Sequence, residues 1–169
     1  HLHAGRLQLA DPVRASANAA AAPASRLSLR AGESVTVEEL LKGMIVRSAN
    51  DAAVALAEHV AGSEAAFVAQ MNERARAWGM AHTHFITATG LDRPGHISTA
   101  RDMSRTASAL IRDFPDYYAW FALKQYAYHK ARQYNSNALL WRDDSIDGVK
   151  TGHTRGAGFC LVASARRDD

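Results

Sequence analysis

The sequence predicts an α+β fold in which a helical lobe packs on an antiparallel sheet. Apolar residues recur at helical spacing within residues 36–121, and they alternate with polar residues in parts of 124–169. A chain of 169 residues has the length of one ordinary domain and can bury a core. We therefore expect one domain over 1–169, with its lobe at about 36–121 and its sheet at about 124–169.

The first 35 residues carry weaker signals. Gly5 is a typical helix stop, so residues 1–6 are interpreted as the last turn of a helix. Leu27 and Leu29 alternate with polar residues, and Pro23 closes an alanine run. These patterns predict short strands around a brief helical turn between residues 7 and 35.

Capping signals then mark a series of helices. Thr36 and Glu39 have the spacing of a capping box, and apolar residues follow at helical spacing, which predicts an amphipathic helix. Residues 47–49 interrupt it, and Asn50 is expected to cap the next helix. The dipeptide at 62–63 separates that helix from a third, which closes at Gly79.

A long connection over residues 80–98 follows, and connections of this length are often functional. A further helix is expected from Ser98 or Thr99 to about Arg112, and a short one from Pro115 through Phe121.

Strand patterns dominate the remainder. Tyr126 and Tyr128 alternate with other residues, and residues 159–165 alternate along their length. The last strand runs into 166–169, as if entering a hairpin whose return strand is absent. With the helical turn at the other end, this pattern leads us to expect a chain cut at both ends.

Composition excludes several classes of partner. The chain has 20 Lys plus Arg and 17 Asp plus Glu, scattered without a basic tract, so nucleic-acid binding is not expected. No apolar run approaches the ~18 residues of a membrane span, so any membrane association is expected only through segments outside this sequence. Cys160 cannot form an internal disulfide, and its apolar neighbours predict a buried thiol.

Three alternative site chemistries lack support. His82 and His84 are spaced as a ligand pair, as are His1 and His3, but no third ligand joins either pair, and we expect neither metal nor cofactor. A Gly-x-Ser-x-Gly elbow is absent, which argues against a Ser-His-Asp hydrolase. The aromatic residues within 117–128 are explained by core packing more simply than by base stacking.

Two short strings carry residue types suited to catalysis. Ser48-Ala49-Asn50 lies at a break between predicted helices, where a hydroxyl and a carboxamide can orient a reacting group. Lys150-Thr151-Gly152 leads toward a predicted strand and combines an ammonium, a hydroxyl and a glycine that lets a ligand approach the backbone. Taken singly, each string also has a structural explanation: helix capping for the first, and a surface lysine before a turn for the second.

Together, Ser-x-Asn and Lys-Thr-Gly resemble two of the three signatures of serine penicillin-recognising enzymes. Longer stretches resemble the low-molecular-weight penicillin-binding proteins, the serine-type D-alanyl-D-alanine carboxypeptidases. These stretches are residues 40–57, 83–85, 90–92, 96–102, 137–141 and 147–159. The resemblance implies a β-lactamase/transpeptidase-like fold, of which this chain is a partial catalytic domain.

The third signature of that family, Ser-x-x-Lys, supplies the acylated serine and its base, and it is absent here. Three residues before the four lysines stand Glu39, Phe121, Ala127 and Asp147. The resemblance places the motif just upstream of residue 1. We therefore expect the 169-residue chain alone to be inactive.

The resemblance also implies roles for four residues. Ser48 would pass a proton toward the departing D-alanine amine, and Asn50 would orient the substrate amide and the absent lysine. Lys150 would hold this network electrostatically and attract the terminal carboxylate, which the Thr151 hydroxyl would bind.

Gly152 and His153 complete the implied substrate-binding residues. The backbone N–H of His153 would be one oxyanion-hole donor, and the substrate would lie antiparallel to the strand that starts here. Ser136 occupies a place where some relatives carry arginine.

Two classes of function follow. The first is a serine-type D-alanyl-D-alanine carboxypeptidase that acts on peptidoglycan pentapeptides through an acyl-enzyme, binds β-lactams, and works in the bacterial cell envelope outside the cytoplasmic membrane; a D,D-endopeptidase is its variant. The second is a non-catalytic peptidoglycan-binding homologue that has lost the nucleophile.

Overall fold

A computed structural model describes residues 1–167, so Asp168 and Asp169, with the end of the predicted hairpin strand, lie outside the described residues. Its strands form three separate antiparallel pairs: β1 (Pro12–Arg14) with β2 (Ser34–Thr36), β3 (Gln125–Tyr128) with β4 (Ala131–Tyr134), and β5 (Ile146–Thr154) with β6 (Gly158–Ala165). The predicted α+β class is confirmed, with the strands distributed over three pairs.

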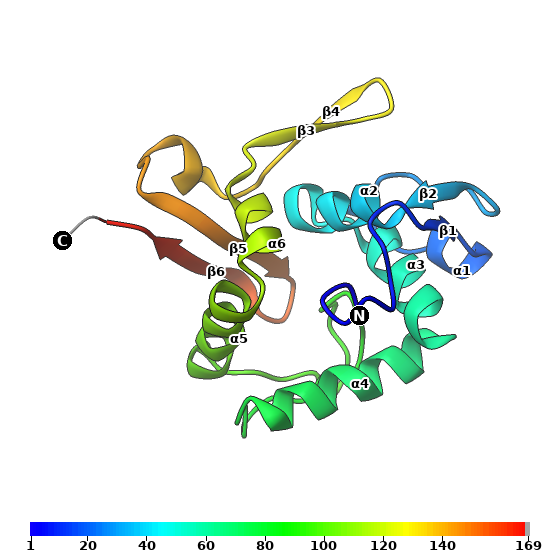
Figure 1. Ribbon diagram of the computed structural model, residues 1–169. Helices are drawn as coiled ribbons and strands as arrows, with labels where there is room; N and C mark the ends of the chain where they lie inside the picture. Colours follow the sequence, from blue (N-terminus) through cyan, green and yellow to red (C-terminus); the bar gives the residue numbers. More distant parts are fainter. Residues whose placement is uncertain (168–169) are drawn as a thin grey trace.

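The helices follow the order that the capping signals predict (Figure 1). They are α1 (Ala17–Ala20), α2 (Val37–Lys42), α3 (Asn50–Ala61), α4 (Glu64–Ala77), α5 (Ala100–Asp113) and α6 (Pro115–Tyr118). Shorter turns are a π-helix, Gly43–Arg47, and two 3₁₀ helices, Ala119–Ala122 and Ala138–Trp141. In Figure 1 the β5–β6 pair lies beside α5 and α6, on the opposite side from α2, α3 and the β1–β2 pair.

The main core lies where α2 and α3 meet the β1–β2 pair. The capping box at the start of α2 is confirmed, because the Thr36 hydroxyl accepts from Glu39 N at 3.2 Å while Glu39 Oε2 accepts from Thr36 N at 3.3 Å. Val37 and Leu40 of α2 have no exposed surface. In α3 every residue over 50–57 is buried, so this helix runs through the interior.

Residues 2–7 form turns and bends, not a helix. Gly5 has a φ of 67° and donates to Leu2 O, while Arg6 N donates to His1 O at 3.1 Å. This pair of bonds is the pattern found where a helix ends at a left-handed glycine. The stop signal at Gly5 is therefore confirmed locally.

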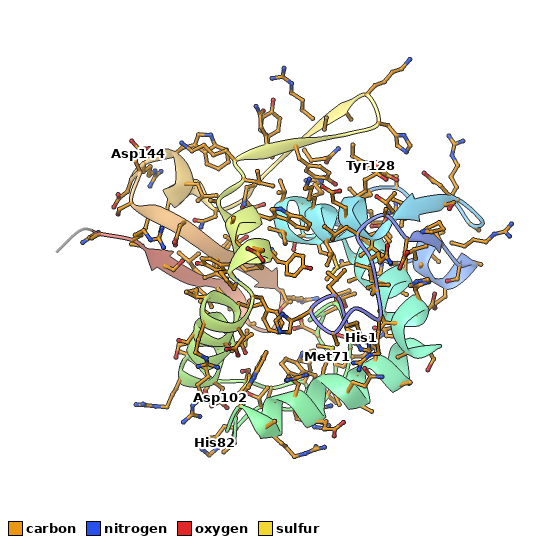
Figure 2. The ribbon with its side chains drawn as sticks, viewed as in Figure 1. His1, Met71, His82, Asp102, Tyr128 and Asp144 are labelled. Carbon is orange, nitrogen blue, oxygen red and sulfur yellow. The ribbon has the colours of Figure 1, made fainter. Side chains whose placement is uncertain are left out.

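The connection over residues 80–98 is fixed to the helical lobe. Asn72 of α4 accepts from Phe85 N and donates to Phe85 O, both at 2.8 Å. The buried Asp102 of α5 accepts from His82 N at 2.9 Å, and the two residues lie together at one edge of the molecule in Figure 2. This connection has a fixed conformation, because hydrogen bonds to α4 and α5 hold it at several points.

A second, smaller core fixes the position of β5. Val149 packs with Tyr118 of α6 and Ala107 of α5. Asn137, 1% exposed, donates to Gly148 O at 3.2 Å. A Cβ at Gly148 would lie 2.7 Å from Tyr118 Oη, so only glycine lets β5 approach α6 this closely. The strand is thereby held two residues before Lys150.

Tyr126 of β3 reaches into the main core, where its hydroxyl is buried without a hydrogen-bond partner in the described residues. Burial, followed by the charges of Glu39 and Asp51, raises the pKa of this hydroxyl far above its ordinary value. Because an unpaired buried hydroxyl costs about 1–3 kcal/mol, we expect Tyr126→Phe to leave the free energy of unfolding unchanged or to raise it by up to about 1 kcal/mol.

Urea denaturation measures this effect. Tyr128→Phe is the matched control, since the Tyr128 hydroxyl bonds to Glu33 at 3.2 Å, and this variant should be the less stable of the two. A loss above about 1 kcal/mol in Tyr126→Phe would show that its hydroxyl has a partner.

Within residues 1–167, no single helix is long and apolar enough to cross a membrane; α3 and α4 meet the length and composition only as a pair bent by 85°.

Candidate active site

A groove of about 960 Å³ separates the helical lobe from β5. All six residues that the sequence singles out line it: Ser48, Asn50, Lys150, Thr151, Gly152 and His153. The fold thus brings together two strings that lie about one hundred positions apart in the chain.

A hydrogen bond links the two strings directly. Lys150 Nζ donates to Ser48 Oγ at 2.9 Å and to the Thr151 carbonyl oxygen at 2.8 Å. Burial lowers the pKa of Lys150 below its ordinary value of 10.5, because desolvation disfavours the ammonium form. The groove therefore contains a half-buried amine–hydroxyl pair able to hold an anion and relay a proton.

Local backbone geometry presents the Ser48 hydroxyl. The π-helix ends at Arg47, and its C-cap residue, Ser48, has a φ of 58° and a ψ of 41°, in the left-handed region that residues other than glycine rarely adopt. Sequence reasoning predicts the break between the helices but not the π-helix. A strained residue between a π-helix and a buried helix is typical of a functional site.

The prediction that Asn50 caps α3 is wrong. Ala49 is the N-cap, and Asn50 is the first residue of the helix. The Asn50 carboxamide instead donates to Pro23 O at 3.0 Å and to Ala24 O at 3.1 Å. Both N–H groups of the carboxamide are occupied with the segment before β2, so it is the Asn50 carbonyl that can serve a ligand.

The remaining predicted residues follow Lys150 along β5. Thr151 is half-buried, and Gly152 and His153 are exposed. His153 pairs with Phe159 of β6, and their ring centroids lie 4.4 Å apart. Together, these residues of β5 form one extended side of the groove.

Cys160 is exposed, which corrects the prediction of a buried thiol. Its partner across the β5–β6 pair is Gly152, which has no side chain to cover the sulfur. Its apolar neighbour Phe159 is also 93% exposed, so apolar sequence neighbours do not indicate burial on this strand.

Sequence reasoning assigned no role to several other groove residues. Ser25 reaches the groove because Asn50 N donates to Ser25 O at 2.8 Å, a contact that no local pattern signals. Thr89, Gly90 and Leu91 also line the groove. The family-like string at 90–92 marked this segment, but its place in the groove depends on the fold. Ser136 also lines the groove.

Within residues 1–167, no three His, Cys, Asp or Glu side chains gather as a metal site would require. The groove residues offer hydroxyl, ammonium and amide groups, together with the imidazole of His153 and the thiol of Cys160.

Comparison with known proteins agrees with this geometry. Residues 1–169 match the family described as Peptidase S11, D-alanyl-D-alanine carboxypeptidase. The D-alanyl-D-alanine carboxypeptidase DacC of Escherichia coli (strain K12) is 45% identical over 99% of this chain and 44% of its own length. Penicillin-binding protein 5 of Haemophilus influenzae is 40% identical, with a TM-score of 0.94 over 98% of this chain and 49% of that one. Penicillin-binding protein 6B of Escherichia coli has a TM-score of 0.91 at 38% identity, over 98% of this chain and 55% of that one.

The chain thus spans about half the length of the relatives it matches. The structural similarity confirms the fold implied by the sequence motifs, and the family match covers the whole chain, including both strings that meet in the groove. This chain belongs to the D-alanyl-D-alanine carboxypeptidase family, peptidase family S11.

Proposed function

We propose that this chain is part of a serine-type D-alanyl-D-alanine carboxypeptidase that acts on peptidoglycan stem peptides, with the nucleophilic serine supplied by a Ser-x-x-Lys motif outside these 169 residues. The observation that carries the proposal is the contact between Lys150 Nζ and Ser48 Oγ, 2.9 Å, in a groove lined by all six candidate site residues.

In the proposed reaction, the lysine of the Ser-x-x-Lys motif takes the proton of the serine hydroxyl as the serine oxygen attacks the carbonyl carbon of the penultimate D-alanine. An acyl ester forms, and the C–N bond to the terminal D-alanine breaks. Ser48 passes a proton to the departing amine, and the Lys150 ammonium stabilises the negative charge near this hydroxyl. Water then hydrolyses the ester, which releases the shortened peptide as a carboxylate and restores the serine hydroxyl.

The other groove residues position the substrate in this proposal. Thr151 binds the terminal carboxylate, and the glycine at 152 leaves room for the substrate backbone. His153 N–H supplies one oxyanion-hole donor, and Asn50, through its free carbonyl, accepts from a substrate or enzyme N–H group. β-Lactams would acylate the same serine.

The proposed substrate is the peptidoglycan pentapeptide that ends in D-Ala-D-Ala, and the proposed location is the bacterial cell envelope, outside the cytoplasmic membrane. Both follow from the family, because peptidoglycan is assembled and trimmed there.

The absence of Ser-x-x-Lys from the sequence favours a second candidate, a non-catalytic homologue that binds peptidoglycan. Labelling with a fluorescent penicillin separates the two. We expect the complete gene product to be labelled covalently and the 169-residue chain to remain unlabelled.

Mass spectrometry then locates the adduct. An adduct on the serine of a Ser-x-x-Lys motif supports the carboxypeptidase. A complete gene product that forms no adduct and releases no D-alanine supports the non-catalytic homologue. An adduct within the 169 residues would mean that the nucleophile has been misplaced.

A further inference from the structure

From Lys150 onward, two hydrogen bonds in the described residues join β5 and the turn after it to the helical lobe and its long connection, in addition to the packing of Val149 on α5 and α6. At one end, Lys150 bonds to Ser48. At the other end, Asp92 Oδ2 accepts from the backbone N–H of Gly156, at 2.9 Å, in the turn between β5 and β6. Between these two places lies the stretch of β5 along which an extended substrate would lie.

Asp92 is part of the connection 80–98, which the helical lobe holds firmly. Asn72 binds Phe85, and Glu64 Oε1 accepts from Ala88 N at 2.9 Å. In the described residues, Asp92 makes the hydrogen bonds that join this connection to the β5–β6 hairpin. The Asp92 carboxylate therefore links the fixed connection over residues 80–98 to the turn between β5 and β6.

Three features show that the contact suits a carboxylate. The hydroxyl of Thr154 and then the N–H of Gly156 hold the pKa of Asp92 below its usual range. A Cβ at Gly156 would lie 3.2–3.3 Å from the carboxylate atoms, so glycine permits the close approach. The Thr154 hydroxyl also accepts from Ala157 N at 3.0 Å, which organises the turn around the same point.

We propose that Asp92 is a positioning residue that fixes the β5–β6 turn to the helical lobe and so sets the width of the groove at its His153–Thr154 end. This inference rests on the function proposed above. Without the link, the turn moves away from the loop, and the oxyanion-hole and substrate-binding groups of β5 lose their alignment with the nucleophile.

The test uses the complete gene product that carries the Ser-x-x-Lys motif. We expect Asp92→Ala to lower the rate constant of acylation by a β-lactam about three- to tenfold, since one exposed hydrogen-bonded link is lost. Asp92→Asn should recover most of the rate, because a carboxamide oxygen still accepts from Gly156 N. Asp144→Ala is the matched control: its side chain is fully exposed, and its nearest ionic partner, Lys124, is 3.9 Å away.

Gly156→Ala tests the same contact from the side of the β5–β6 turn, because the added Cβ would lie against the Asp92 carboxylate. We expect a similar fall in rate, and the double variant with Asp92→Ala should be no slower than the worse single variant. Hydrogen exchange at the amide of Gly156 should accelerate in Asp92→Ala, while the melting temperature stays within a few degrees of that of the unaltered protein.

The inference is overturned if Asp92→Ala acylates at the unaltered rate, if Asp92→Asn is as slow as Asp92→Ala, or if Asp144→Ala slows acylation equally. If the unaltered protein is not acylated at all, the proposed function fails instead. Exchange at Gly156 still tests the link in that case, because it needs no catalysis, and unchanged exchange in Asp92→Ala overturns it.

Discussion

Replacing Lys150 with alanine is expected to lower the rate constant of acylation by a β-lactam by about 10²–10³-fold in the complete gene product. Lys150 is the only Lys or Arg among the groove-lining residues in the described part of the chain, and its ammonium donates to Ser48 Oγ at 2.9 Å. Removing it leaves the proposed proton relay without its cation. Stopped-flow acylation with a chromogenic β-lactam measures the loss.

Lys130→Ala is the control for this prediction, because Lys130 is an exposed lysine in the turn between β3 and β4. Its acylation rate should match that of the unaltered protein, and circular dichroism should show that both variants are folded. A Lys150→Ala protein that acylates within about threefold of the unaltered rate would remove Lys150 from the mechanism.

The same lysine predicts a pH dependence. Because burial lowers the pKa of Lys150 below 10.5, the ammonium is lost at a lower pH than for an exposed lysine. Acylation should therefore fall on the alkaline side at a pH below 10.5. The alkaline fall that Lys150 causes should be absent from the residual activity of Lys150→Ala, because this variant has no amine at position 150.

Asp51→Ala is expected to lower the free energy of unfolding by roughly 3–5 kcal/mol. The Asp51 carboxylate is 0% exposed and accepts from Leu27 N and Leu29 N, both at 3.0 Å, and from Ala52 N at 2.9 Å. The two leucines are themselves buried, so the substitution leaves their N–H groups without partners in the core. Equilibrium unfolding in guanidinium chloride measures the difference.

Asp116→Ala is the matched control, since Asp116 is exposed in the first turn of α6, and it should change the free energy of unfolding by less than about 0.5 kcal/mol. Asp51→Asn keeps one acceptor oxygen and should fall between the two. A loss below about 1 kcal/mol in Asp51→Ala would mean that solvent or another group satisfies the two leucine amides.

The neighbouring residues Asn50 and Asp51 show where prediction from the sequence stops. The Ser-x-Asn string indicated that Asn50 belongs to a site, and the groove contains it. Its side chain, however, donates hydrogen bonds to the carbonyl oxygens of Pro23 and Ala24. The Asp51 carboxylate accepts from the N–H groups of Leu27 and Leu29. Together they fix the segment that carries Ser25 into the groove, a relation between positions more than twenty residues apart that no periodicity expresses.

The sequence by itself determined the order of the main helices, the capping box of α2 and the family, whereas the cap of α3 is Ala49 and not Asn50. The capping box at Thr36, the stop at Gly5 and the break before Asn50 depend on hydrogen bonds within a few residues, so local patterns report them. Only the tertiary structure decided the left-handed Ser48, the exposure of Cys160 and the link from Asp92 to Gly156. The Asp92 link joins residues 64 positions apart, and the exposure of Cys160 depends on which residue of β5 lies opposite it in the hairpin. Contacts made in three dimensions determine both features, and local sequence patterns do not report such contacts.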